Sequence, residues 1–248
     1  MVAYTAFLAD RLLPTSIPGY LNVIRLIHLE AGLDNPLSEN WELNLIKKGI
    51  NRLKGQPPKQ KLPITISILR KIHGVLDMSD SRDCAFWVSL LVGFYGFLRK
   101  STLLPASANP QLGKYIAWED VLDFTLCSFT LRIKYSKVIQ FGQRFLSIPY
   151  ARVLDGKLCP VRAMLVHLGM SPVKSKIEPL FSYTQQGCVV AFPHAAFVAR
   201  LKSVLTLVGV DSGLYSAHSL RRGGASFAFR AGLSPLEIKQ FGCDTQAK

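Results

Sequence analysis

Acidic residues are scarce in this chain of 248 residues. The 30 Lys and Arg residues outnumber the 16 Asp and Glu residues, which leaves a formal net charge of +14. Such an excess favours an anionic partner. Nucleic acid is the leading candidate, because clustered Lys and Arg gain affinity by displacing counterions from phosphates. The alternative from charge alone is a basic protein whose charges serve only solubility.

A long hydrophobic run is also missing, although hydrophobic residues make up 49% of the sequence. The longest apolar stretch, 84–98, ends at Arg99 and Lys100 and is shorter than the roughly 20 residues that a membrane span needs. The first residues lack the basic region and cleavage site of a secretory signal. We therefore expect a folded protein with a proper core and no membrane partner.

Paired cysteines at the spacing of a metal or redox motif are absent as well. The cysteines are odd in number and far apart, which favours a reduced, intracellular setting; they are Cys84, Cys127, Cys159, Cys188 and Cys243. Four histidines are equally scattered, namely His28, His73, His167 and His194. The sequence has no glycine-rich phosphate loop and no Gly-x-Ser-x-Gly nucleophile elbow. We expect neither a metal nor a cofactor.

A change in composition divides the chain into two modules. Residues 56–63 combine prolines with basic residues and predict a linker. In residues 1–55, apolar residues recur at helical spacing in three stretches, which predicts a small helical domain. The third of these helices carries a basic cluster without an acid in its second half: Lys47, Lys48, Arg52 and Lys54.

Residues 64–248 predict a larger domain that is mostly helical. Apolar periodicity favours helices over 64–76 and from about 80 to 98, and further helices open at Pro160, Pro193, His218 and Pro235. Within 115–150 the residues alternate with the period of strands around a turn at 140–143. The predicted fold class is therefore mainly α with a small antiparallel β-sheet, in two domains.

Three separated segments carry the candidate chemistry. In the first, 96–104, Arg99 lies at the end of the apolar helix. An arginine there needs an anionic partner, because burying an unpaired charge is costly. The alternative is an ordinary arginine that satisfies the last carbonyls and the dipole of the helix.

The second segment, 132–140, places basic residues at the tip of the predicted hairpin. No acid occurs between Asp123 and Asp155, whereas five bases do: Arg132, Lys134, Lys137, Arg144 and Arg152. A solvated strand face explains this pattern about as well as contact with DNA does.

The third segment reads His-Ser-Leu-Arg-Arg-Gly-Gly-Ala over 218–225. His218 and Arg221 are three residues apart, so they share one helix face and can grip one group together. The tandem glycines cost an interior helix about 1 kcal/mol each relative to alanine, which predicts close approach of another backbone, helix or ligand. The alternative is a helix start with ordinary surface bases.

The order of these three segments resembles the tyrosine recombinase (phage-integrase) family, across nearly the whole chain. Residues 1–55 are similar to its helical core-binding domain and 64–248 to its catalytic domain. The first and third motifs are also similar to those of recombinases of eukaryotic tyrosine-recombinase mobile elements. A nuclear location follows if the host is a eukaryote.

The resemblance implies double-stranded DNA as the partner and a role for each motif residue. Arg99 and Arg221 would hold the reacting phosphate, His218 would assist proton transfer, and Lys137 would protonate the leaving 5′-oxygen, with Lys134 as the alternative. The basic cluster of the first domain, with Lys134 and Arg222, would contact DNA. The two domains would close on the duplex as a clamp.

The match ends before the family's nucleophile. Residues 238–242 fit its pattern, but 243–248 contain no Trp, His or Tyr, and Thr102 stands where the family often has an acid. We therefore expect a catalytic domain that is truncated before its tyrosine and inactive alone in strand cleavage and rejoining. Tyr215 precedes His218 and is a poor substitute.

Three interpretations remain open. In the first, the chain is a fragment of a recombinase or integrase, which forms a homo-oligomer on DNA or receives the tyrosine in trans from a full-length relative. In the second, the chain is a non-catalytic DNA-binding remnant or a co-opted mobile-element protein. The third is a basic helical scaffold that binds RNA or protein.

Overall fold

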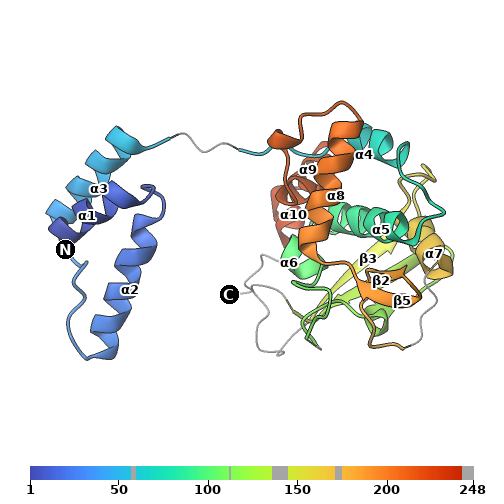
Figure 1. Cartoon of the computed structure of the whole chain (residues 1–248), viewed down its shortest axis with the longest axis horizontal. Coiled ribbons are helices and arrows are strands. Elements are labelled where there is room, and N and C mark those ends of the chain that lie inside the picture. The colour runs from blue at the N-terminus through green and yellow to red at the C-terminus, as the bar shows by residue number, and fades with distance from the viewer. Residues whose placement is uncertain (57–59, 112, 136–144, 171–174, 242–248) are drawn as a thin grey trace. The chain divides into compact units, whose positions relative to one another are not determined.

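The computed structural model describes residues 1–56, 60–111, 113–135, 145–170 and 175–241 (Figure 1). The chain divides into two compact units, Met1–Lys59 and Gln60–Lys248. Residues 60–63, which lie within the predicted linker, therefore belong to the second unit. No helix of the described ranges has the length and apolar character that a membrane crossing needs.

The first unit consists of three helices, as the helical spacing predicted: α1 (Val2–Arg11), α2 (Ile17–Glu30) and α3 (Trp41–Lys54). Pro18 lies in the first turn of α2, where a missing N–H costs nothing. Asn40 caps α3, because its side chain accepts a hydrogen bond from the Leu43 amide at 2.8 Å. The core of this unit is small and consists of Leu8, Ala9, Ile17, Leu21 and Leu43.

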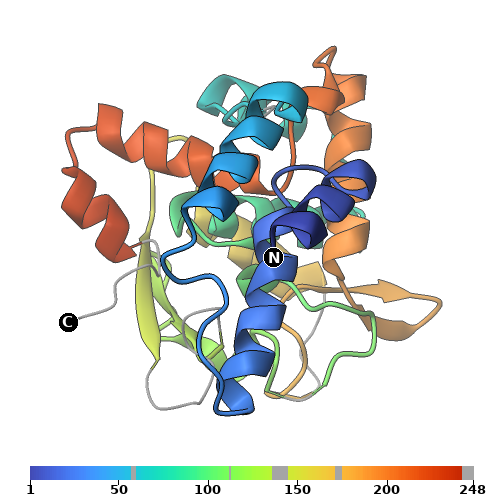
Figure 2. The same ribbon diagram turned by 90° about the vertical axis from the view of Figure 1, so that its left-hand side faces the viewer.

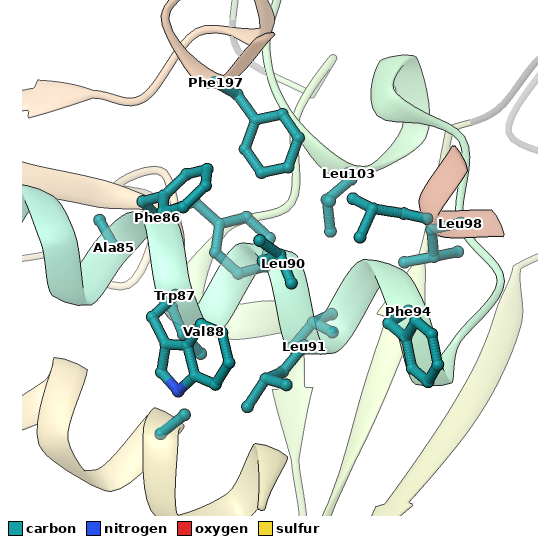
Figure 3. Close-up of a cluster of buried hydrophobic side chains, with 14 of the residues drawn as sticks. Ala85, Phe86, Trp87, Val88, Leu90, Leu91, Phe94, Leu98, Leu103 and Phe197 are labelled. Carbon is teal, nitrogen blue, oxygen red and sulfur yellow. The ribbon is translucent and has the colours of Figure 1, made fainter. Parts of the chain in front are cut away.

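Helix α5 (Ser81–Tyr95) runs through the middle of the second unit (Figure 1). Every residue from Asp83 to Phe94 is buried, so other elements cover this helix on all sides. Figure 3 shows large side chains such as Phe86 leaving the helix in different directions, with Phe197 and Leu103 among the groups around them. This explains why the sequence here is apolar without a polar face.

A three-stranded antiparallel sheet packs in the same unit, in the order β1 (Val121–Leu122), β2 (Ser128–Ile133) and β3 (Leu146–Ala151). Phe129, Leu131 and Ile133 of β2 are buried in alternation with more exposed residues, as the period of two predicted. The predicted turn at 140–143 lies outside the described residues. The predicted fold class, mainly α with a small antiparallel sheet, is confirmed.

A second sheet is present in addition to the one predicted. It is a hairpin of β4 (Ser182–Gln185) and β5 (Cys188–Ala191). Gln186 and Gly187 in its turn both have positive φ, 51° and 76°, as tight two-residue hairpins require. A glutamine at the first of these positions is an unusual turn residue, so the sequence signal for this hairpin is weak.

The remaining helices surround α5 and the sheets. Helices α9 and α10 come last and meet at a sharp turn (Figure 2, red). Gly232, with φ of 98°, ends α9, and Ser234 and Glu237 cap α10 through reciprocal hydrogen bonds. The other helical elements are α4 (Ile66–His73), α6 (Lys100–Leu103), η1 (Trp118–Asp120), α7 (Pro160–Met170), α8 (His194–Leu207), η2 (Ser212–Leu214), α9 (His218–Arg230) and α10 (Pro235–Phe241).

Candidate functional site

The turn that follows α5 positions Arg99. The helix ends at Tyr95 rather than near Leu98, where the apolar run predicted its end, because Phe97 adopts a left-handed conformation with φ of 51°. The Leu98 amide then donates to the Gly93 carbonyl at 3.0 Å, which closes the helix end in the manner of a Schellman motif. Arg99 therefore directly follows a closed turn that packs on the core, and it is the N-cap residue of α6.

The tandem glycines of α9 permit close backbone contact, as their cost in a helix predicted. A Cβ atom on Gly224 would lie 1.9 Å from the Phe94 carbonyl oxygen, and one on Gly223 would lie 2.0 Å from the Ile64 carbonyl oxygen. Real Cβ atoms do not approach a backbone oxygen this closely. Both positions therefore require glycine, and α9 packs directly against the end of α5.

Close packing brings the two motif arginines to one place. A guanidinium nitrogen of Arg221 donates to the Phe97 carbonyl at 2.9 Å, in the turn just before Arg99. His218 lies one helical turn before Arg221 and is exposed at the start of α9. Partial burial of the ring lowers its pKa below the usual 6.5, and the positive charges of Arg221, Arg222 and Arg99 lower it further. The structure thus gathers Arg99, His218 and Arg221, three of the four residues predicted to surround one phosphate.

A hollow of about 500 Å³ opens beside Arg221 between α9 and α10. Its apolar lining includes Phe97, Phe229 and Ile238, and its charged lining consists of Arg221, Arg230 and Lys239. The surface beside Arg221 is therefore concave and positively charged.

Lys134 lies just beyond the end of β2 and is held by two acids. Its ammonium contacts Asp120 at 2.8 Å and also pairs with Glu119, while Arg132 contacts the same Asp120 carboxylate at 3.2 Å. Partial burial alone would lower the pKa of Lys134, but the hydrogen bonds to Asp120 and Glu119 outweigh it and raise that pKa. Asp120 is 1% exposed and also accepts from the Ala117 amide. The bases of this strand are thus partly neutralised by acids from η1, an element that lies earlier in the sequence than the basic segment.

The other predicted DNA-contacting residues differ in their surroundings. Lys137, the predicted general acid, lies outside the described residues. In the first unit, Lys47, Lys48, Arg52 and Lys54 all lie on α3. The Lys54 ammonium donates to the Ala9 carbonyl at 2.8 Å and contacts Asp10 at 3.3 Å, so it also ties α3 to α1.

Arg222 points to the beginning of the second unit. Its guanidinium donates to the Lys61 carbonyl and, at 3.3 Å, to the side-chain oxygen of Gln60. Sequence reasoning grouped Arg222 with the DNA contacts, because nothing in the motif itself reveals this partner. Across the described ranges, no three His, Cys, Asp or Glu side chains gather closely enough to hold a metal ion.

Comparison with known proteins gives a consistent result. No family model matches the sequence. The integrase/recombinase xerD homolog of Selenomonas ruminantium is 27% identical over 246 residues, which cover 96% of this chain and 67% of that protein.

Solved structures extend this likeness to the fold. The XerH site-specific recombinase bound to a palindromic difH substrate matches with a TM-score of 0.60 and 15% identity over 100% of this chain. The Tn1549 transposon integrase in complex with circular intermediate DNA matches with a TM-score of 0.58 and 12% identity over 97% of this chain and 75% of its own. The chain spans 65% of that XerH chain, which is less than two thirds.

The chain therefore has the fold of the tyrosine recombinases and is similar in sequence to one of their members along almost its whole length. The resemblance predicted from the three motifs is confirmed.

Proposed function

We propose that the chain binds duplex DNA as a tyrosine recombinase or integrase does, with one backbone phosphate seated between Arg99, His218 and Arg221. The gathering of these residues from the end of α5 and the start of α9 carries the proposal. In a recombinase of this kind, the site would serve the cleavage and rejoining of DNA strands during recombination or integration.

The chemistry of the three residues suits a phosphate that gains negative charge in a transition state. A guanidinium keeps its charge at every accessible pH and can hold two phosphate oxygens at once. A site that is positive before the ligand arrives stabilises that charge without rearrangement. The lowered pKa of His218 favours its neutral imidazole, which can accept a proton or a hydrogen bond in the site.

The domain roles follow from the same proposal. Residues 1–55 would form the core-binding domain that presses Lys47, Lys48, Arg52 and Lys54 on the DNA backbone, 56–63 the linker, and 64–248 the catalytic domain. Lys137 would be the general acid, since Lys134 is engaged by Asp120. Copies of the chain would associate on paired DNA sites.

Strand cleavage needs a nucleophile that this sequence does not supply at the expected place. The last tyrosine in the sequence is Tyr215, which is 8% exposed and precedes the His218 helix. We propose that these 248 residues alone form no covalent bond to DNA and that the attacking tyrosine comes from outside them, for example from a full-length relative. The same observation favours a non-catalytic DNA-binding protein as the second candidate function.

Binding of duplex DNA tests the first part of the proposal. Arg221→Ala should weaken binding about tenfold or more in fluorescence anisotropy, since a charge-assisted contact to phosphate is lost. Lys202→Ala, an exposed change on α8, is the matched control and should leave the affinity nearly unchanged. Equal affinities of the Arg221→Ala variant and the unchanged protein would refute the phosphate site.

Covalent trapping on nicked DNA tests the second part. This chain alone should give no protein–DNA adduct, and an adduct would contradict the argument about the nucleophile. Adding a full-length relative whose own arginines are inactivated separates the two candidates. An adduct that depends on Arg221 of this chain supports complementation in trans, whereas no adduct supports a purely DNA-binding role.

A further inference from the structure

The first residues of the second unit are fastened to the segment that leads into α9. The Leu62 amide donates to the Leu214 carbonyl at 2.8 Å, and the Ile64 amide donates to the Ser219 carbonyl at 3.0 Å. The Lys61 ammonium donates to the Gly213 carbonyl. We call residues 60–64 the docked segment. It is also the part of the chain that follows the connection to the first unit.

Arg222 holds the docked segment from the side of α9. Its two terminal nitrogens reach two acceptors, the Lys61 carbonyl and the Gln60 side chain. The planar fork of a guanidinium can serve both acceptors at once, whereas a lysine ammonium is a single point of contact. Next to it, Gly223 allows the Ile64 backbone to touch the helix. One turn of α9 therefore contacts the docked segment in two ways, through the hydrogen bonds of Arg222 and through backbone packing at Gly223.

We propose that Arg222 is a positioning residue that clamps the docked segment onto α9 and thereby fixes the helix that carries His218 and Arg221. The inference rests on the proposed function for what those two residues bind. It assigns the Arg222 guanidinium to the protein's own backbone rather than to a DNA phosphate. Arg222 would then affect DNA binding indirectly, through the placement of its neighbours.

Hydrogen exchange in the free protein tests the clamp without DNA. The reporters are the amides of Leu62 and Ile64, whose acceptors are carbonyls at the entrance to α9. In Arg222→Lys, which keeps the charge but loses the fork, exchange at Leu62 should accelerate about tenfold, the effect of one lost hydrogen bond. Arg230→Lys, an exposed change near the end of the same helix, is the control and should not alter either amide.

A second variant covers the case in which a change at Arg222 disturbs folding. Gln60→Ala removes one acceptor of the clamp and leaves α9 intact. It should accelerate exchange at Leu62 in the same direction and to a smaller degree. Unchanged exchange at Leu62 in both Arg222→Lys and Gln60→Ala would overturn the proposal.

Salt titrations of DNA binding then separate positioning from direct contact. If Arg222 positions its neighbours, Arg222→Lys lowers affinity, and Arg222→Gln leaves the dependence of affinity on salt nearly as steep as before. If Arg222 contacts a phosphate, Arg222→Lys retains affinity and Arg222→Gln reduces the salt slope by about 1. The second result overturns the proposal. A protein that binds no DNA at any salt concentration would refute the proposed function, while the exchange data would still decide the clamp.

Discussion

Helix α9 and strand β2 both carry the basic residues of a motif, but their electrostatic surroundings differ. Partial burial lowers the pKa of His218 on α9, and the positive charges of three neighbouring arginines lower it further. Around Lys134, just beyond β2, the neighbouring charges are those of Asp120 and Glu119, and they raise its pKa. Basic residues in a sequence therefore do not by themselves identify a surface that is ready for an external anion. The acids that neutralise the bases of β2 come from η1, which lies earlier in the chain.

Helix α9 and strand β2 are also held to the rest of the second unit by different interactions. Helix α9 contacts the core through the bare backbone of Gly224, which lies against the Phe94 carbonyl. Strand β2 is joined to η1 through the buried carboxylate of Asp120. Steric contact leaves no room for adjustment, whereas an ion cluster near the surface can exchange partners with water. We therefore expect substitutions at Gly224 to reduce the stability of the second unit more than substitutions at Asp120 do.

Gly224→Val should produce the largest effect. The new side chain would overlap the Phe94 carbonyl, which belongs to the central helix and cannot move away cheaply. We expect the second unit to lose about 3 kcal/mol of stability or more, and DNA binding with it. Urea unfolding followed by far-UV circular dichroism measures the loss.

The matched control for this change is Gly169→Ala on α7. A Cβ atom there would meet nothing within 4 Å. Alanine should stabilise the helix by about 0.5–1 kcal/mol through lower backbone entropy in the unfolded chain. A Gly224→Val protein as stable as the control would show that α9 does not depend on close backbone contact.

Asp120→Asn, which weakens the attachment of β2 to η1, should cause the next largest loss of stability. The asparagine removes the charge that holds Arg132 and Lys134, although it keeps an acceptor for the Ala117 amide. Since both cations are partly exposed and can turn to water, we expect a loss of about 2 kcal/mol rather than the full cost of a buried unpaired charge. Urea midpoints at constant ionic strength check the value. A loss of stability as large as that of Gly224→Val would show that the ion pairs of β2 anchor it as firmly as close backbone contact anchors α9.

Much of this architecture could be predicted from the sequence, for reasons that are local. The periodicity of three helices in the first unit, the apolar run of α5 and the alternation of β2 are properties of single segments. The Gly-Gly pair also predicted a close neighbour, because its cost in a helix demands compensation. These signals need no knowledge of distant residues.

The parts that could not be predicted depend on partners far away in the chain. Nothing near Lys134 indicates that Asp120 will neutralise it, and nothing near Arg222 indicates that Lys61 will accept its hydrogen bond. The end of α5 at Tyr95 is a third example, since Phe97 is an unusual residue for a left-handed turn and gives no stop signal. In each case tertiary contacts decide between alternatives that local preference leaves open.

Lys134→Ala should affect DNA binding less than Arg221→Ala does. The Lys134 ammonium is already engaged by two carboxylates, so its removal costs no direct contact to a DNA phosphate. We expect less than about a threefold change in affinity, which corresponds to a contribution within the range of exposed ion pairs. Anisotropy titrations of both variants at one salt concentration provide the comparison. An equal loss in the two variants would mean that β2 contributes as much to binding as α9.

The smallest effect should be a shift in the pKa of His218. It tests directly whether the charge environment of α9 differs from that of β2. In Arg99→Gln one of the charges that lower its pKa is gone, so the pKa of His218 should rise, which an NMR titration of the imidazole can follow.

A phosphate bound beside the imidazole should raise the same pKa, because the anion favours the charged ring. By linkage, DNA affinity should then increase as the pH falls from the pKa of His218 in the complex to its lower pKa in the free protein, because the two states differ in protonation only between these values. His218→Gln should remove this part of the pH dependence, and Lys134→Ala should leave it unchanged. A pKa of His218 that is the same with and without DNA would place the phosphate elsewhere than beside His218, Arg99 and Arg221.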